Sequence, residues 1–257
     1  MRYNNYHKHT HYSNIRTLDC ISKPEDYIKR AVELGHDTYF TTEHGFQGNI
    51  YEAQTLCEKY GIKPIYGVES YYVDDIEDKT SRTMYHIILI AMTNNARREI
   101  NRIMSIANND GYYYKPRIDL NLLLSLPGDE VVVTTACVAS RMFKKDNTWL
   151  DNFFIPVKNH FGNNFYLEVQ AHVDKNQSEY NKKLLKVHEK YNIPLIHAND
   201  SHYIYPEDAW KRDYLQKSSG IFMDDEQGWF MDYPDGNTLF HRFQTQKVLT
   251  DFLPFHG

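Results

Sequence analysis

The stretch IPLIHANDSHY, residues 193–203, is an apolar run that ends on two potential metal ligands, Asp200 and His202. A short apolar run bounded by proline and by polar residues is typical of a buried β-strand. Side chains two residues apart on an extended chain point to the same face. The stretch therefore predicts a strand over 194–198 whose carboxyl end presents a carboxylate and an imidazole on one side.

A second pair with the same spacing lies near the N-terminus, where HKHTHYS at 7–13 follows a short extended segment at 2–6. His7 and His9 are two residues apart, so both imidazoles can reach one ion. One such pair is common at protein surfaces and alone indicates little. Two pairs at the ends of two predicted strands are much less expected by chance, and they indicate a metal site.

The rest of the chain alternates between the two kinds of periodicity. Further strands are predicted at 37–42, 63–73, 84–92, 130–135 and 164–170, and helices at 24–34, 47–60, 94–108, 177–191 and 206–217. Repeated strand–helix units predict an α/β fold with a parallel, barrel-like sheet, whose site lies at the carboxyl ends of the strands.

Three further candidate ligands lie directly after predicted strands: His44 in TTEHG, Glu69 in GVESY and Cys137 in VVVTTAC. Because the carboxyl ends of parallel strands meet at one mouth of a barrel, we expect these side chains to converge with the two pairs. Taken alone, Cys137 is best interpreted as a small buried hydrophobe. Its position among the other candidates favours a thiolate ligand instead.

His86 begins its predicted strand instead of ending it. The polar segment 74–82 lies between Glu69 and His86, and an antiparallel hairpin that turns there would bring the two side chains together. Asp19 lies in the loop after His9 and can reach the same place. Imidazole, carboxylate and thiolate together are the ligand set for zinc, iron or manganese, and a carboxylate such as Glu69 can bridge two ions.

The composition excludes several classes of protein. The 257 residues are 41% hydrophobic and carry a formal net charge of −5, as in an ordinary globular chain. The longest apolar run, 87–92, is far shorter than the roughly 20 residues that span a bilayer, and the polar N-terminus lacks the apolar stretch of a secretory signal, so we expect a cytoplasmic protein with no membrane partner. The three cysteines are widely spaced and predict reduced thiols, while the short basic clusters predict no duplex-binding groove.

The motifs HKHTHYS, TTEHG, GVESYYV, YHIILIA, YYKPRID, TACVASR and NDSHYIYPEDA occur in the order and approximate spacing of the PHP (polymerase and histidinol phosphatase) domain family. The resemblance covers about residues 1 to 217. The segments YYKPRID and FYLEVQ are similar to the branch that forms the N-terminal domain of bacterial replicative DNA polymerase III alpha subunits, more than to the free-standing histidinol phosphatases.

The resemblance implies a distorted seven-stranded β/α barrel, similar to a TIM barrel, with three divalent ions (zinc, manganese or iron) at the carboxyl ends of its strands. It also implies a role for each candidate ligand. One ion would be held by His7, His9, Glu69 and Asp200, a second by Glu69, His86 and Cys137, and the third by Asp19, His44 and His202. Within this set we expect Glu69, Asp200 and His202 to act in catalysis.

Two positions depart from the family pattern. Glu43 stands where the family usually has Asp, and the loop to Asp19 is longer than usual, which makes Asp19 the weakest of the nine assignments. Many polymerases of the family have lost ligands from this site. All nine positions are retained here, which favours a site that binds metal.

The resemblance implies phosphoester hydrolysis associated with DNA replication, with a DNA 3′ end as the substrate and 3′ to 5′ exonuclease or phosphodiesterase activity. Lys115 and Arg117 could clamp the phosphate, or they could be solvated loop charges. A small phosphomonoester of the histidinol phosphate type is an alternative substrate. Hydrolysis by Cys137 as a nucleophile is disfavoured, because the metal interpretation already accounts for that residue.

A different alternative is a structural module, in which the metals only brace a barrel that docks a polymerase body or a proofreading exonuclease. No polymerase active site is expected within these residues. The expected organisation is a PHP domain over 1–219 followed by an irregular arm over 220–257, which is acidic and aromatic and could link to further domains or cover the pocket.

Overall fold

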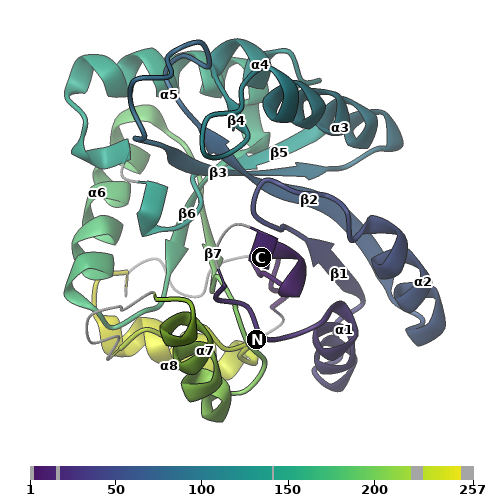
Figure 1. The fold of residues 1–257 in the computed structure, drawn as a ribbon. Helices are drawn as coiled ribbons and strands as arrows, with labels where there is room; N and C mark the ends of the chain where they lie inside the picture. Colours follow the sequence, from purple (N-terminus) through teal and green to yellow (C-terminus); the bar gives the residue numbers. More distant parts are fainter. Residues whose placement is uncertain (1–2, 16–17, 141, 221–227, 250–257) are drawn as a thin grey trace.

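A computed structural model describes residues 3–15, 18–140, 142–220 and 228–249. Its centre is a curled, seven-stranded sheet in the order β1-β2-β3-β5-β6-β7, with β4 paired to β2 off this path (Figure 1). The strands are β1 (Thr38–Thr41), β2 (Lys63–Tyr72), β3 (Tyr85–Ala91), β4 (Arg117–Ile118), β5 (Val131–Thr134), β6 (Phe165–Gln170) and β7 (Leu195–Ala198). The mixed α/β fold with a half-barrel sheet confirms the expected fold class.

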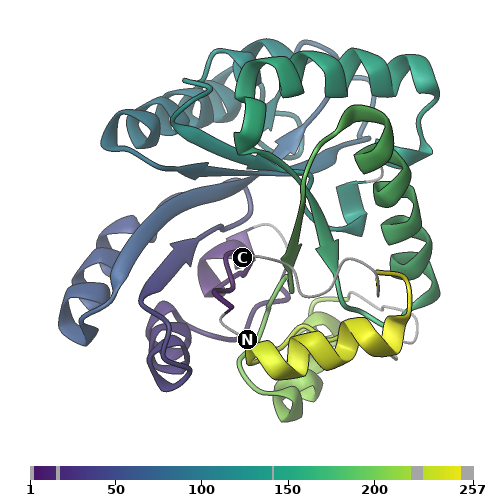
Figure 2. The same cartoon turned by 180° about the vertical axis from the view of Figure 1, so that it is seen from behind.

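The helices lie around the outside of the curled sheet, as the two opposite views show (Figures 1 and 2). They are α1 (Pro24–Glu33), α2 (Ile50–Tyr60), α3 (Asn94–Asn109), α4 (Leu120–Leu124), α5 (Asn147–Phe161), α6 (Lys175–Tyr191), α7 (Ala209–Ser218) and α8 (Gly236–Gln246). Short 3-10 turns occupy His11–Ile15, Val138–Ser140, Met142–Lys144, Gly162–Asn164 and Pro206–Asp208. None of the helices in the described part of the chain is long and apolar enough to span a bilayer.

The sheet is parallel except at β3, which runs antiparallel to both β2 and β5. The register pairs Tyr71 with His86 and Glu69 with Ile88. Glu69 therefore lies diagonally across from His86 on the same face of the hairpin. This confirms the hairpin expected from the polar segment between them.

The N-terminal segment, expected to be extended at 2–6, lies between β1 and β7. Its described residues form no regular β-ladder with either strand. Lys8 makes an isolated parallel bridge to Ser201, in which the Ser201 N–H donates to the His7 carbonyl and the His9 N–H donates to the Ser201 carbonyl. On the other side, the Lys8 N–H donates to the Thr42 hydroxyl. The segment thus joins the two ends of the open sheet and places two histidines beside both.

The main hydrophobic core lies between the sheet and α3, α5 and α6, where Ile87, Leu89 and Val133 are fully buried. A second cluster packs α1 and α2 against β1. A third cluster, around Tyr6 and Ile88, lies inside the curl of the sheet. The inner cluster separates the two mouths of the barrel.

Outside the sheet, the structure contains three helices that the sequence did not predict: α4, α5 and α8. The interval 136–163, where no element was expected, contains α5, whose interior includes Pro156. A proline inside a helix removes a hydrogen bond and usually indicates a break, which hides this helix in the sequence pattern. The expected irregular arm contains α8, whose first turn is capped by the Asp235 carboxylate; the division into domains stays a prediction.

Candidate metal centre

Four side chains from three separate segments meet at the mouth formed by the carboxyl ends of β1, β2, β5, β6 and β7. The His7 Nε2 atom lies 3.3 Å from Glu69 Oε1 and 3.2 Å from Asp200 Oδ1. The His9 Nε2 atom lies 3.5 Å from Glu69 Oε2 and 3.2 Å from the same Asp200 oxygen. The two pairs with i, i+2 spacing are therefore brought together, as expected from their positions at strand ends.

Glu69 is the centre of the cluster, because it contacts ligands on both of its sides. Its Oε2 atom lies 2.5 Å from His44 Nδ1, and its Oε1 atom lies 3.1 Å from His86 Nδ1. The Cys137 sulfur lies 4.0 Å from Glu69 Oε1 and 3.8 Å from His86 Nδ1. A carboxylate with imidazoles facing both oxygens has the arrangement needed to bridge two ions.

Asp19 and His202 complete the cluster at its edge, where His202 Nε2 lies 3.5 Å from Asp19 Oδ2. The nine predicted ligands thus lie in one place. Four overlapping groups have ligand atoms within 4.8 Å of one another: His7, His9 and Glu69; His44, Glu69 and His86; His9, His44 and His202; and Asp19, Cys20 and His202.

Several buried polar atoms of the cluster have no hydrogen-bond partner in the described residues. They are His7 Nε2, His9 Nε2, His44 Nδ1, Glu69 Oε2 and Asp200 Oδ1. Buried polar atoms in proteins are nearly always hydrogen-bonded, and exceptions call for an explanation such as a bound ion. All five atoms belong to predicted ligands and point toward one another, so the donor set fits divalent cations.

The protonation states of two carboxylates and of His9 suit cation binding, whereas the facing carboxylates outweigh burial and raise the pKa of His7 and of His44. Burial raises the pKa of the Glu69 carboxyl, but the facing imidazoles of His86 and His44 outweigh burial and hold it well below its usual range. The pKa of Asp200 is likewise held well below its usual value, because His7 and His202 outweigh burial. Burial, with His44 beside it, lowers the pKa of His9 to about 3, which leaves its imidazole neutral. Ionised carboxylates and a neutral imidazole are the forms that bind metal.

A buried residue that the sequence analysis did not select, Glu168 on β6, fixes the orientation of His7. The Glu168 Oε1 atom lies 2.6 Å from His7 Nδ1, and its Oε2 atom accepts a 2.7 Å hydrogen bond from the Tyr6 hydroxyl. A carboxylate on the far ring nitrogen directs the other nitrogen toward a metal. The available signal was a lone acid inside the apolar run FYLEVQ, where an uncompensated charge would be costly.

Glu43 also supports the ligands without entering the cluster. Its carboxylate accepts hydrogen bonds from the Ser13 hydroxyl at 2.5 Å and from the Thr10 main-chain N–H at 2.9 Å. Ser13 in turn lies 3.2 Å from His9 Nδ1. The longer Glu side chain at this position therefore braces the loop that carries His9.

Two non-glycine residues of the site have left-handed backbone conformations, Asp200 at φ 51° and Ala136 at φ 52°. Such conformations are unfavourable for most side chains and are found where the surrounding structure enforces them, often at functional sites. Ala136 immediately precedes Cys137, and Asp200 is itself a predicted ligand. The backbone is thus bent at two points that aim ligands inward.

The two residues expected to clamp phosphate lie in different surroundings. Lys115 is half-buried, with its ammonium 5.2 Å from the centre of the Tyr71 ring, which itself lies 5.2 Å from the His86 ring. Arg117 is buried, and its guanidinium donates to the main-chain carbonyls of Gly111, Asp78 and Ile76. The expectation for Arg117 is therefore wrong, because its donors hold two loops together and do not face the cluster.

The segment after residue 228 contacts the rim of the site. The His202 N–H donates to the Met231 carbonyl at 2.8 Å, and the Ser201 hydroxyl donates to the Asp232 carbonyl. His172 is also buried, and its Nδ1 accepts a hydrogen bond from the Phe230 N–H at 3.0 Å. These bonds tie the chain that follows α7 to the loop that carries Asp200 and His202.

Comparisons with known proteins agree with this geometry. The model of the PHP domain family matches residues 5–172. The chain is similar to the DNA polymerase III alpha subunit of Aquifex aeolicus, with 31% identity over an alignment of 230 residues that covers 81% of this chain and 19% of the relative. It is also similar to that of Borreliella burgdorferi, with 33% identity over 221 residues, 81% of this chain and 19% of the relative.

The chain thus spans about a fifth of the length of these curated relatives. Among solved structures, it resembles a proposed metal-dependent phosphoesterase from Bifidobacterium adolescentis, with a TM-score of 0.52 and 14% identity over 94% of this chain and 95% of that chain. This likeness concerns the fold alone. The family match over more than half of the chain shows that the chain belongs to the PHP domain family.

Proposed function

We propose that this chain is a metal-dependent phosphoesterase that hydrolyses DNA from its 3′ end. The observation that carries the proposal is the convergence of nine imidazole, carboxylate and thiolate side chains at one barrel mouth, with five buried ligand atoms that have no hydrogen-bond partner among the described residues. The similarity to DNA polymerase III alpha subunits supports DNA as the substrate and a cytoplasmic role in replication.

We infer three ion positions, as the resemblance to the family implies; the four overlapping groups of close ligand atoms support a centre that holds more than one ion. The first ion would be held by His7, His9, Glu69 and Asp200, the second by Glu69, His86 and Cys137, and the third by Asp19, His44 and His202. His, carboxylate and thiolate ligands suit zinc, iron or manganese, and availability in the cell would decide among them. Cys20, whose thiol donates to Asp19 Oδ1 at 3.1 Å, is an extra sulfur at the third position that the sequence analysis did not select.

When bound, such ions acidify water and neutralise the oxygens of a phosphoester. The protein's own side chains would position the ions and bind the phosphate. Glu69, Asp200 and His202, which are 1%, 6% and 4% exposed, would act in catalysis as ligands that fix the positions of the ions around the phosphoester. Lys115 would add a point charge for a phosphate oxygen.

A second candidate function is a structural module in which the same centre binds metal without turnover and the barrel docks a polymerase body or a proofreading exonuclease. The observation that favours it is that the relatives are about five times longer than this chain. Hydrolysis of a small phosphomonoester is a third candidate, since the same ligands would serve it.

The test is hydrolysis of single-stranded DNA labelled at its 5′ end, of the same DNA with a blocked 3′ end, and of a chromogenic phosphomonoester, each with added manganese or zinc. Stepwise shortening of only the DNA with a free 3′ end is expected. The variant Asp200→Ala should be inactive, whereas His241→Ala, an exposed histidine on α8, should be as active as the wild type. Bound metal without cleavage of any substrate would contradict the proposal in favour of the structural module.

A further inference from the structure

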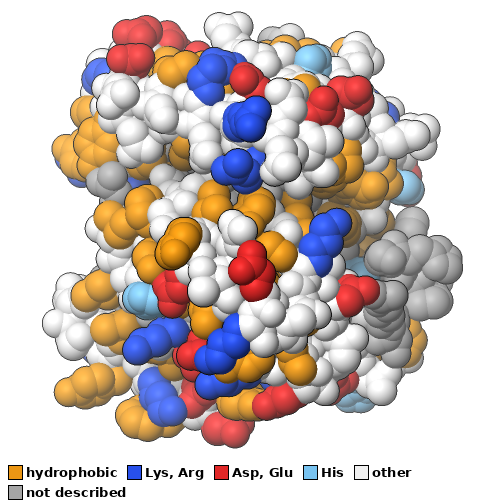
Figure 3. All heavy atoms as spheres, turned by 90° about the vertical axis from the view of Figure 1, so that its right-hand side faces the viewer, with side chains coloured by type: hydrophobic (Ala, Val, Ile, Leu, Met, Phe, Trp, Pro, Cys, Tyr) orange, Lys and Arg blue, Asp and Glu red, His pale blue; other side chains and the backbone are white. Residues whose placement is uncertain are grey.

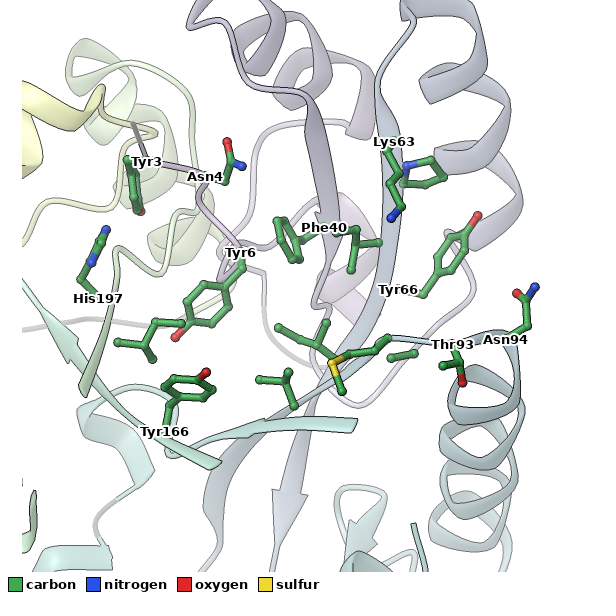
Figure 4. A pocket seen from close by; sticks show the side chains of 17 residues that line it. Tyr3, Asn4, Tyr6, Phe40, Lys63, Tyr66, Thr93, Asn94, Tyr166 and His197 are labelled. Carbon is green, nitrogen blue, oxygen red and sulfur yellow. The ribbon is translucent and has the colours of Figure 1, made fainter. Parts of the chain in front are cut away.

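The barrel has a second hollow at the mouth opposite to the metal centre. It has a volume of about 760 Å³, and its walls include Tyr6, Phe40, Ile65, Tyr166 and Ile196. Figure 4 shows aromatic rings from separate segments around one space, with Lys63 at its side. This volume lies in the range of small-molecule binding sites.

The strands explain why the two mouths differ. On β2, Ile65 and Glu69 are four residues apart, so both face the inside of the curl, one near each end. The same holds for Ile90 and His86 on β3, which runs in the opposite direction. The strands that supply ligands to the metal centre at one end therefore supply apolar side chains to the hollow at the other end.

Two buried polar atoms at the hollow have no hydrogen-bond partner in the described part of the chain. They are the hydroxyl of Tyr3, whose side chain is 3% exposed, and the Oδ1 atom of Asn4. Both residues line the hollow. A buried polar atom without a partner is costly, and a ligand or water that hydrogen-bonds to it removes that cost.

Charge at the hollow is supplied by Lys63. It is exposed at the start of β2, and its side chain extends toward the space between Phe40 and Tyr66 in Figure 4. The described residues record no ion pair for Lys63. An ammonium at the edge of an apolar, aromatic hollow is complementary to an anion with an apolar body.

We propose that this hollow is a binding site for a planar aromatic anion. The aromatic walls would stack with or meet the edge of a ring, Lys63 would pair with its acidic group, and the free Tyr3 hydroxyl would hydrogen-bond to a polar substituent. The site is distinct from the metal centre, because no predicted metal ligand lines it. Tyr6 stands between the two: its ring lines the hollow, and its hydroxyl donates to Glu168.

The probe for this proposal is 8-anilinonaphthalene-1-sulfonate, a planar aromatic anion whose fluorescence rises in apolar sites. Titration of the folded chain should show one saturable site per chain. Lys63→Gln should weaken binding about fivefold, as expected for loss of one partly solvated ion pair. Val132→Trp, which fills the hollow from β5, should abolish binding, whereas Lys29→Gln on α1 should not change it.

Circular dichroism and thermal unfolding of each variant would show whether it is folded. Chelator-treated protein that is still folded should also bind the probe. Such binding would show that the hollow takes up the probe independently of the metal centre. Equal binding by the wild type, Lys63→Gln and Val132→Trp would place the probe elsewhere and overturn the proposal. A second outcome would also overturn the proposal: the wild type does not bind the probe and is a dimer, and Val132→Trp dissociates that dimer. In that case a second copy of the chain covers the hollow.

Discussion

The two mouths of the barrel are built from the same strands and have opposite chemistry. At one mouth, nine predicted ligands crowd together, and Glu69 and Asp200 are nearly fully buried among imidazoles. At the other, aromatic and aliphatic side chains surround an open space of about 760 Å³. The difference shows that a polar centre and an apolar site can lie at opposite ends of one curled sheet. On β2, only about four residues separate a side chain of one site from a side chain of the other.

The layer between the mouths makes this separation possible. Ile88, Ala136 and Ala198 are buried inside the curl, and the Tyr6 ring lies with them. The charged groups of the metal centre therefore pair with one another and with Glu168, which contacts His7. They form no ion pair with the described side chains that line the apolar mouth. Figure 3 shows a third environment, an outer face on which acidic and basic side chains are interspersed.

The largest expected effect comes from removing one ligand at the polar mouth. His9→Ala or Asp200→Ala should lower metal content and reduce hydrolysis by about a thousandfold or more, because metal ions supply several kcal/mol of transition-state stabilisation. Elemental analysis and single-stranded DNA cleavage would measure both. His241→Ala serves as the control, and an equal loss of activity in that folded variant would remove the distinction between the cluster and other histidines.

The apolar mouth should make the stability of the folded chain depend on pH. Burial lowers the pKa of His197, which lines the hollow, to about 4. His197 is therefore protonated near pH 6.5 in the unfolded chain but only near pH 4 in the folded chain. The free energy of unfolding should fall by roughly 3 kcal/mol for this one group as pH decreases from about 6.5 to 4.

This contribution can be isolated by comparing urea unfolding of the chelator-treated wild type and His197→Phe across that pH range. The variant should lose less stability than the wild type as pH falls. Parallel stability curves would show that His197 is protonated equally in the folded and unfolded chains, and the apolar character assigned to this mouth would be wrong.

A smaller effect is expected from the layer between the mouths. Glu168→Gln keeps the size of the side chain but removes the charge beside His7 Nδ1. Loss of such a supporting partner typically weakens metal binding about 10- to 100-fold. Calorimetric titration with zinc would measure this change, while probe binding at the hollow should be unaltered. Unchanged zinc affinity would mean that His7 does not depend on Glu168 for its orientation.

The smallest expected effect concerns the rim of the polar mouth. Lys115→Ala should raise KM for single-stranded DNA about fivefold with little change in kcat, since a partly solvated charge contributes about 1 kcal/mol to binding. Lys186→Ala on α6 provides a matched control. If steady-state kinetics gave the same KM for the wild type and Lys115→Ala, Lys115 would have no part in holding phosphate.

The sequence was most informative where ligands follow strands. The i, i+2 pairs and the hairpin around 74–82 predicted that His86, Glu69 and the remaining ligands converge, because strand ends share one mouth and pairing has a fixed register. It was least informative where a side chain serves the main chain. Arg117 resembles a phosphate clamp in sequence, yet it satisfies three loop carbonyls.

Other features depend on contacts between distant parts of the chain. Glu168 becomes a partner of His7 only when β6 and the N-terminal segment are placed side by side, and no local pattern carries that information. Helix α5 is concealed by Pro156, which tertiary packing tolerates. The described residues that line the hollow come from seven separate segments, and no local sequence pattern marks any of them.

The number of divalent ions bound per chain, measured by elemental mass spectrometry on protein purified without chelator, tests the assignment of the nine ligands. We expect two to three ions of zinc, manganese or iron per chain, and a reduced number in Glu69→Ala, the residue that faces imidazoles on both sides. Absence of bound metal in the folded wild type, even after incubation with zinc or manganese, would contradict the assignment of the nine ligands.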